Sequence, residues 1–131
     1  MPLMMVDTYD KNETVNVMNL NWCTLNHGVF INLGIGTNKK THENIKKTGA
    51  FTVSLATKEL IKAADYFGSM SSYRDPNKFA KTGLKESKSK YIHAPIIEES
   101  KLVMECELVE IVNQKNIDVG IGRILNVSVD E

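Results

Sequence analysis

The segment Lys101–Val112, which reads KLVMECELVEIV, alternates like a β-strand and breaks its alternation once. Its first part carries apolar residues on one face and acidic residues on the other, as in a strand with one face in water: Leu102, Met104, Cys106 and Leu108 oppose Glu105 and Glu107. At Val109 the apolar series moves one position out of phase, which indicates a β-bulge or a strong bend. Barrels need bends of this kind.

Five further segments have strand patterns, so six strands are predicted. Residues 117–129 alternate cleanly, with Arg123 as the single charged residue among the apolar ones. A charged group on an apolar face is costly to bury unless it is paired. We therefore expect Arg123 to meet a carboxylate or a polar cleft. Two more strands are predicted at residues 28–35 and 50–56.

The N-terminal part of the chain is predicted to form a β-hairpin. Residues 3–9 and 15–20 have strand patterns and flank the sequence DKNE, whose Asp and Asn suit a tight reversal. Strand alternation then separates the side chains of the second strand into two pairs: Val15 and Val17 on one face, Asn16 and Met18 on the other.

Three helices are predicted between the strands. The first follows a glycine-containing loop and is bounded by Thr41 as N-cap and Gly49 as the left-handed C′ residue. Glu43 falls in its first turn, where the helix dipole favours an acid. The other two helices are expected at residues 57–67 and 75–82.

Composition limits the classes of function. The 131 residues are 42% hydrophobic and 24% charged, which is typical of one globular domain. Sixteen basic and sixteen acidic residues cancel, so the chain lacks the one-signed field that a nucleic-acid or anionic-membrane partner requires. No apolar run approaches the roughly 20 residues that span a bilayer, and the first residues lack a signal-peptide pattern. We expect a cytoplasmic protein with no nucleic-acid or membrane partner.

No pattern identifies a catalytic group or a metal site. Cys23 and Cys106 are isolated from each other in sequence, so neither a disulfide nor a zinc site is indicated. His42 and Glu43 lack the second histidine of HExxH, and no nucleophile stands beside a base. Cys106 is expected in the core, and the role of Cys23 stays open.

The loop ahead of the first helix, Gly34–Lys40, reads GIGTNKK and has the features of an anion site. It lacks the third glycine of a dinucleotide fingerprint. A phosphate at this helix N-terminus would receive backbone N–H groups, the Thr41 hydroxyl and the charge of Lys39 or Lys40. The alternative is a solvated, capped helix start that binds nothing.

Five pieces of the sequence, in this order, resemble the flavin reductase-like family, which includes flavoredoxins: NVMNLNW, KKTHENIKKTGAFTVSL, AADYFGSMSSYRDPNKFAKTGL, APIIEESKLVMECELVEI and GRILNVSVDE. The resemblance spans nearly the whole chain, residues 1–131, as a single domain. It implies a mainly β fold with peripheral helices, a six-stranded antiparallel split β-barrel that binds FMN and forms a homodimer. It also implies an FMN-dependent oxidoreductase or electron carrier, with a nicotinamide nucleotide or a redox protein as donor.

The resemblance also implies which residues bind FMN. The Asn, Trp, Thr and Lys of the family's motifs match Asn16, Trp22, Thr41 and Lys78 in this chain. Together with the loop and the neighbouring strand, the predicted cofactor site comprises Asn16, Met18, Asn19, Asn21, Trp22, Thr37, Asn38, Lys39, Lys40, Thr41, Asn44 and Lys78. Two alternatives stay open: Trp22 as a core or interface aromatic, and Lys78 as a solvated helix residue.

The chain also departs from the family pattern. The connection CTLNHGV lacks the paired prolines often seen there, and Asn116 and Ile117 stand where flavoredoxin-like members often have a histidine. Members commonly continue beyond the position of the final VDE, so the family's C-terminal tail is expected to be absent. These departures leave a second function open, in which the barrel has lost productive flavin binding and serves as a dimeric scaffold or binding module.

Overall fold

The structure is a computed structural model that describes residues 4–20, 22–55, 60, 62–63 and 77–129. Its elements are β1 (Met4–Tyr9), β2 (Val15–Leu20), β3 (Cys23–Asn26), β4 (Phe30–Gly36), α1 (Lys40–Thr48), β5 (Ala50–Leu55), η2 (Ala80–Thr82), β6 (Glu86–Lys88), β7 (Pro95–Ile97), β8 (Leu102–Val112) and β9 (Ile117–Val129). No helix among the described residues is long and apolar enough to cross a membrane.

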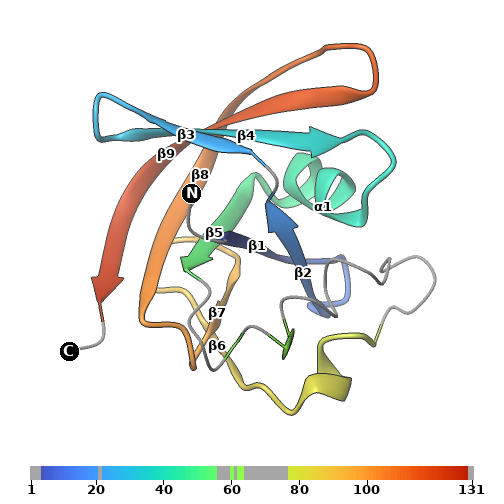
Figure 1. Ribbon diagram of the computed structural model, residues 1–131, viewed down its shortest axis with the longest axis vertical. Coiled ribbons are helices and arrows are strands. Elements are labelled where there is room, and N and C mark those ends of the chain that lie inside the picture. The colour runs from blue at the N-terminus through green and yellow to red at the C-terminus, as the bar shows by residue number, and fades with distance from the viewer. Residues whose placement is uncertain (1–3, 21, 56–59, 61, 64–76, 130–131) are drawn as a thin grey trace.

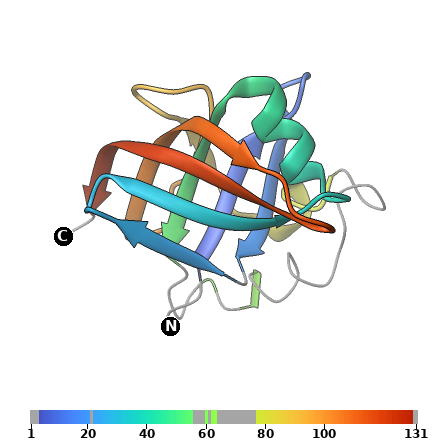
Figure 2. The same cartoon turned by 90° about the horizontal axis from the view of Figure 1, so that it is seen from above.

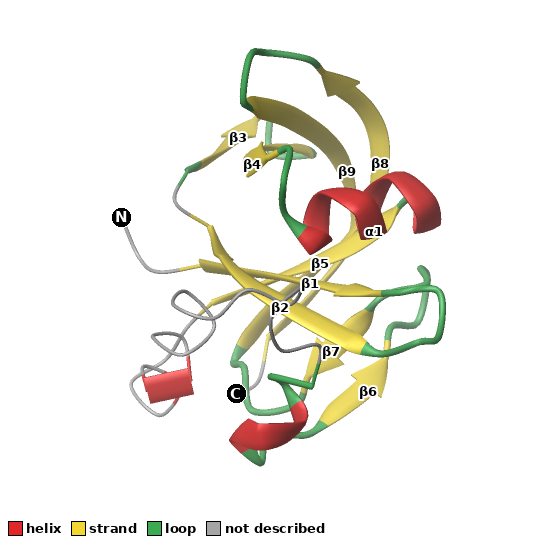
Figure 3. Ribbon diagram, turned by 90° about the vertical axis from the view of Figure 1, so that its right-hand side faces the viewer, coloured by secondary structure: helices red, strands yellow, loops and turns green. Residues whose placement is uncertain are grey.

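Seven antiparallel strands form one curled sheet in the order β2-β1-β5-β8-β9-β4-β3 (Figure 1). Figure 2 shows β3, β4 and β9 side by side, with α1 across one end of the curl. The predicted split β-barrel is therefore confirmed, with seven strands in the main sheet in place of six. β6 and β7 pair separately and lie below β1 and β5 in Figure 3.

The additional strand of the main sheet is β3, which lies in a connection predicted to be a loop. It is joined to β4 by the three residues 27–29, in a turn whose central residues His27 and Gly28 have φ angles of 55° and 73°. Positive φ at both central residues is the geometry that matches the twist of a two-stranded hairpin. The turn carries His-Gly in place of the usual Asn-Gly or Asp-Gly. The strand is only four residues long, so the sequence pattern does not predict this hairpin.

Two bulges bend the β8–β9 pair. Leu108 pairs with Gly122 and Glu110 with Ile121, so Val109 is the extra residue on β8, as its phase break predicts. A second shift, between Glu105 and Cys106, leaves Leu125 as the extra residue on β9. The prediction of clean alternation through residues 117–129 is therefore wrong beyond Arg123, because the bulge exchanges the two faces of β9.

The main sheet has an apolar cluster on each face. The cluster inside the curl, here called the inner cluster, contains Met4, Val6, Leu20, Ile31, Leu33, Ile35, Ile45, Phe51, Val53, Met104 and Cys106. The cluster on the opposite face, the outer cluster, contains Met5, Tyr9, Val15, Val17, Leu60, Phe79 and Ile97. The predicted separation of the β2 side chains is confirmed, since Val15 and Val17 belong to the outer cluster and Met18 packs against the inner one.

Because β1, β5 and β8 are covered on both faces, the prediction of a solvated acidic face on β8 is wrong for Glu105. This side chain is 1% exposed. Its carboxylate accepts hydrogen bonds from the Tyr91 backbone N–H at 3.0 Å and from Asn126 Nδ2 at 2.7 Å. Cys106, in contrast, is fully buried in the inner cluster, as predicted.

The first predicted helix is present as α1. Glu43 lies in its first turn and Gly49 ends it at φ 69°, both as predicted. The N-cap is Lys39, however, so the assignment of Thr41 as N-cap is wrong. Thr41 lies inside the first turn of the helix, and its hydroxyl makes a tertiary contact with Asn16 of β2 in place of a cap.

The two other predicted helices fall largely outside the described residues. Of residues 57–67 only 60, 62 and 63 are described, and in the third segment Asp75 and Pro76 lie outside them. Its end is described as the short helix η2, closed by Gly83 at φ 77° as predicted.

We expect Gly122→Ala to destabilise the fold strongly, because Phe51 crosses β9 at this glycine. A Cβ at residue 122 would lie 2.5 Å from Phe51 Cζ and 3.3 Å from the Glu107 carbonyl oxygen. Overpacking of this kind costs about 1 to 3 kcal/mol. Gly120→Ala is the matched control, since its Cβ would meet only Ile35 Cδ1 at 3.5 Å. Equal urea midpoints for the two variants would contradict the role given to the Phe51 contact.

Candidate functional site

Helix α1 is attached to the β1–β2 hairpin by two buried side-chain hydrogen bonds. Asn16 Nδ2 donates to Thr41 Oγ1 at 2.8 Å, and Asn44 Nδ2 donates to Thr8 Oγ1 at 3.0 Å. All four residues are nearly inaccessible to solvent. The structure thus brings together three predicted site residues, Asn16, Thr41 and Asn44, and gives them a role in holding the helix.

The N-terminus of α1 is open to an acceptor from outside the helix. The side chain of the N-cap residue Lys39 makes no capping hydrogen bond. Thr37, Asn38 and Lys39 are exposed, and Lys40 Nζ lies 3.0 Å from Glu43 Oε2. Since the first N–H groups of a helix have no acceptor within it, this end favours an anion.

The loop before α1 is fixed at its base by backbone contacts. The Thr37 N–H donates to the Asn116 carbonyl oxygen at 3.2 Å, and the Lys39 N–H donates to the Gly36 carbonyl oxygen at 3.1 Å. A Cβ on Gly36 would lie 3.1 Å from Asn38 Oδ1 and 3.3 Å from Lys39 Cγ. The absence of a side chain at Gly36 therefore leaves space in which the loop side chains fold back over β4.

Trp22 lies on the same face of β4 as these loop side chains. A Cβ on Gly34 would lie 3.1 Å from Trp22 Cε3 and 3.8 Å from Ile117 Cγ2. Residues 34 and 36 point to the same face of the strand, so the indole is a neighbour of the loop. Because Trp22 is 45% exposed, it is not a core residue of this chain.

Two predicted residues, Asn19 and Lys78, are not grouped with the α1 site. Alternation along β2 directs Asn19 to the outer face, away from Asn16. Lys78 is 3% exposed, so the interpretation of it as a solvated helix residue is wrong, and the adjacent Phe79 packs in the outer cluster. Asn21 lies outside the described residues.

Sequence reasoning missed the pair His42 and Asp118, which joins the first turn of α1 to β9. His42 Nε2 lies 2.7 Å from Asp118 Oδ2, and the Gln114 N–H donates to Asp118 Oδ1 at 3.2 Å. The hydrogen bond with His42 holds the pKa of Asp118 below its usual value, and the Gln114 N–H contributes in the same direction. No sequence signal links two residues so far apart in the chain.

Arg123 meets a carboxylate, as expected. Its Nη1 lies 3.7 Å from Glu107 Oε1, and its guanidinium carbon lies 5.8 Å from the centre of the Phe30 ring. The side chain is exposed. Arg123 therefore keeps its contact with water, and neither interaction has to offset the cost of burying its charge.

Neither cysteine has the environment of a reactive thiol. Burial raises the pKa of Cys23, and burial together with the neighbouring Glu105 charge raises the pKa of Cys106 to about 12. Both are free thiols, and Cys23 is the more accessible of the two.

Comparison with known proteins identifies similar chains. The family model described as "Flavin reductase like domain" matches residues 1–131. An uncharacterized protein of Archaeoglobus fulgidus is 32% identical over 118 residues, which are 88% of this chain and 66% of that protein. The chain spans 48% and 34% of the length of two further curated relatives.

Solved structures have the same fold. Flavoredoxin of Desulfovibrio vulgaris (Miyazaki F) superposes with a TM-score of 0.92 at 30% identity, covering 99% of this chain and 70% of that one. An FMN-binding protein from Thermus thermophilus superposes with a TM-score of 0.84 at 22% identity, covering 96% of this chain and 68% of that one. At the lower identity the likeness concerns the fold alone.

We expect Asp118→Asn to lower stability at neutral pH and to have little effect in acid. The folded-state pKa of Asp118 is depressed, whereas the unfolded chain has the ordinary value of about 3.9. The carboxylate therefore contributes stability that is complete above the unfolded value and is lost as pH falls through the folded value. Urea midpoints of both proteins from pH 7 to pH 3 test this. A difference that stays constant over that range would contradict it.

Proposed function

Since the chain belongs to the flavin reductase like domain family, we propose that it binds FMN beside the N-terminus of α1 and serves as an oxidoreductase or electron carrier. The observation that supports this most directly is the open start of α1, where Lys39 provides no side-chain cap. A bound FMN supplies a ring that accepts a hydride or two electrons and returns them singly or in pairs. The similarity to a flavoredoxin at 30% identity supports the same cofactor.

The phosphate of FMN is proposed to bind at the first turn of α1. The backbone N–H groups there have no side-chain cap, and Lys39 and Lys40 add positive charge. Thr41 Oγ1 accepts a hydrogen bond from Asn16, so its own hydrogen remains available to donate. Asn16 thereby fixes the direction in which the Thr41 hydroxyl can donate.

The flavin ring is proposed to lie toward Trp22. The indole and Ile117 give an apolar surface over Gly34, and Asn38 supplies a polar group on the same face of β4. Such a surface suits a flat ring that has one polar edge. Met18, whose side chain lies on the inner side of β2, is also proposed to contact the cofactor. Asn19, Asn21 and Lys78 are proposed ligands on the resemblance alone.

The donor is proposed to be a nicotinamide nucleotide or a redox protein. Anaerobic mixing of the FMN-loaded protein with NADH and with NADPH tests this, with loss of flavin absorbance as the readout. A protein that takes up FMN but is reduced by neither nucleotide points to a protein donor. A colourless protein that does not take up added FMN would favour the alternative function, a scaffold or binding module.

Replacing Lys39 and Lys40 by alanine is expected to weaken FMN binding by about 2 kcal/mol, because charge-assisted contacts to phosphate are worth roughly 1.5 to 3 kcal/mol each before compensation. Fluorescence titration with FMN and with riboflavin, which has no phosphate, measures the effect. The matched control is Lys46→Ala with Lys47→Ala, which removes the same charge from the last turn of α1. Riboflavin binding as tight as FMN binding in the wild type would contradict the phosphate site.

We also propose that the chain forms a homodimer through the outside of the β4–β9–β8 region. Val112 pairs with Val119, which pairs with Gly34 beneath Trp22, so these residues form one surface. Trp22, Val112 and Ile117 are 45%, 39% and 53% exposed. Contiguous exposed apolar surface commonly marks an interface, and a two-fold dimer is the commonest way to cover it.

Val112→Glu is expected to shift the protein from dimer to monomer, because a carboxylate would be placed in the apolar contact. Light scattering of the variant at several concentrations measures the effect. Tyr91→Glu is the control, since Tyr91 is 64% exposed in the segment between β6 and β7. A wild-type protein that is monomeric at all concentrations would end the proposal.

A further inference from the structure

Asp7 is a buried acid that the proposed function does not use. It lies in β1 between Met5 and Tyr9 of the outer cluster and is fully buried. The side chain faces the region covered by β7, which packs against both β1 and β5 (Figure 3). A carboxylate here would be deprived of water on every side.

Asp7 belongs to a set of three oxygen–oxygen contacts, two of which link it through Thr52 to β7. Ser54 Oγ lies 2.5 Å from Asp7 Oδ2, and Thr52 Oγ1 lies 2.9 Å from the same oxygen. Thr52 Oγ1 also lies 2.6 Å from the Pro95 carbonyl oxygen. The other carboxyl oxygen, Asp7 Oδ1, is buried and has no hydrogen-bond partner among the residues that the structure describes.

These contacts need more hydrogens than the two hydroxyl groups carry. Each hydroxyl has one hydrogen, and a carbonyl or an ionised carboxylate has none. With Asp7 ionised, Ser54 and Thr52 supply two hydrogens for three contacts. A proton on Asp7 supplies the third and allows the chain Asp7 O–H to Thr52 O–H to Pro95 C=O.

The Pro95 carbonyl depends on Thr52 because it points away from β6. The Ser89 N–H donates to the Ala94 carbonyl oxygen and the Glu98 N–H donates to the Lys85 carbonyl oxygen, which marks these as bonded pairs. Bonded and non-bonded pairs alternate in an antiparallel ladder. The Lys88–Pro95 pair is therefore a non-bonded one, and the Pro95 carbonyl is directed toward β5.

We propose that Asp7 is protonated in the folded protein up to neutral pH, and that its proton fastens β7 to the main sheet through Thr52. Loss of this proton leaves the single Thr52 hydrogen to be shared between the Asp7 carboxylate and the Pro95 carbonyl. The link to β7 weakens, and the β6–β7 sheet becomes a cover whose attachment depends on pH.

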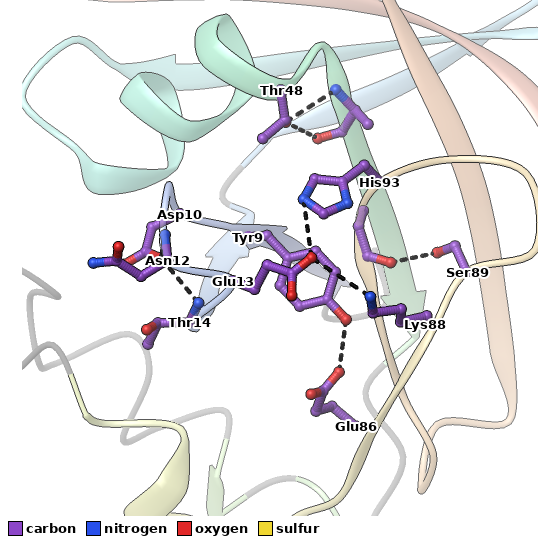
Figure 4. A network of polar contacts seen from close by, with 12 residues as sticks. Tyr9, Asp10, Asn12, Glu13, Thr14, Thr48, Glu86, Lys88, Ser89 and His93 are labelled. Atoms are coloured by element: carbon purple, nitrogen blue, oxygen red, sulfur yellow. Dashed lines mark hydrogen bonds and ion pairs between the residues drawn. The ribbon is translucent and has the colours of Figure 1, made fainter.

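The other ionisable groups on this face have partners of their own (Figure 4). The Tyr9 hydroxyl donates to Glu86 Oε2 at 2.8 Å, and the Tyr9 ring lies 5.0 Å from that of His93. Glu13 Oε1 lies 3.5 Å from Lys88 Nζ and 3.8 Å from His93 Nε2. From β8 the buried Glu105 faces the same side, and Lys78 is buried next to Phe79. Within the described residues, none of these groups pairs with Asp7.

The electrostatics of the site agree with the hydrogen count. Burial raises the pKa of Asp7 to about 7, and the hydrogen bonds of Ser54 and Thr52 offset only part of that effect. The unfolded chain binds this proton only below a pKa of about 3.9. The folded protein therefore holds one more proton between these values, so its stability falls as pH rises toward 7 and the loss is complete above that.

Comparison of the wild type with Asp7→Asn tests the proposal. The amide is a neutral analogue whose NH2 group, at the position of Asp7 Oδ2, can donate one hydrogen to Thr52 Oγ1 and one to Ser54 Oγ, so the variant should fold and lose the pH dependence. For the wild type, the unfolding constant should rise about tenfold per pH unit between pH 5 and pH 6.5, whereas that of Asp7→Asn should stay nearly level. Glu110→Gln, at an exposed carboxyl of β8, should behave as the wild type.

Two measurements separate the fastening of β7 from simple titration. The carboxyl carbon of Asp7, followed by NMR in the wild type, should titrate near neutral pH. The Ser89 and Glu98 N–H groups should lose hydrogen-exchange protection over the same range, with the Gly49 N–H of α1 as internal reference. In Thr52→Val, Asp7 should still titrate while that protection no longer varies with pH.

Several results would overturn the proposal. They are an Asp7 carboxyl that titrates near its ordinary value of about 3.9, an Asp7→Asn variant with the pH dependence of the wild type, and protection of the β6–β7 amides that does not vary with pH. Each of these measurements is made without FMN, so failure of the proposed flavin function leaves the test intact.

Discussion

The structure depends on the close approach of Phe51 to the backbone of Gly122, where the sheet bends over its inner cluster. β8 and β9 each carry one bulge, at Val109 and Leu125, on either side of this contact. Bulges increase local twist and bend the strand that carries them. Because β8 and β9 curve, β4 is brought round to the same side of the molecule as α1. The loop before α1 and Trp22 are neighbours on β4 itself, because Gly34 and Gly36 lie on one face of that strand.

Closing the sheet over one cluster creates a second requirement on its outer face. β1, β5 and β8 have apolar side chains inside the curl and are covered outside by β7 and the segments around it. Polar groups on these strands must therefore find partners within the protein. Glu105 finds Tyr91 and Asn126, and Asp7 finds Ser54 and Thr52. The outer face is thus held by hydrogen bonds as well as by apolar packing.

The sequence predicted the parts of the fold that local patterns control. All six expected strands, the Val109 bulge and the C-terminal glycine of α1 follow from alternation, phase and backbone preference. The errors arise where tertiary contacts decide. Glu105 alternates like a solvent-facing residue, but a distant segment covers it. The four residues of β3 are too few for a clear period.

The candidate site was predictable to a similar extent. The basic loop and the helix start are continuous in sequence, so their proximity follows from the helix itself. The contact of Asn16 with Thr41 and that of His42 with Asp118 join separate elements. Nothing in the spacing of these residues specifies such contacts, because they depend on how far the sheet bends. Asp7 did leave a signal, as a charged residue within the apolar run MMVDTY.

The environment of the two thiols has a consequence for the electron-transfer function proposed above. A thiol reacts with oxidants and alkylating reagents as its thiolate, and a raised pKa reduces the thiolate fraction about tenfold for each unit. Burial raises the pKa of both Cys23 and Cys106, which are the only cysteines in the chain. Peroxide formed when a reduced flavin meets oxygen would find neither thiol activated. Under the proposed function, Cys23 and Cys106 would thus resist oxidation while electrons pass through the bound flavin.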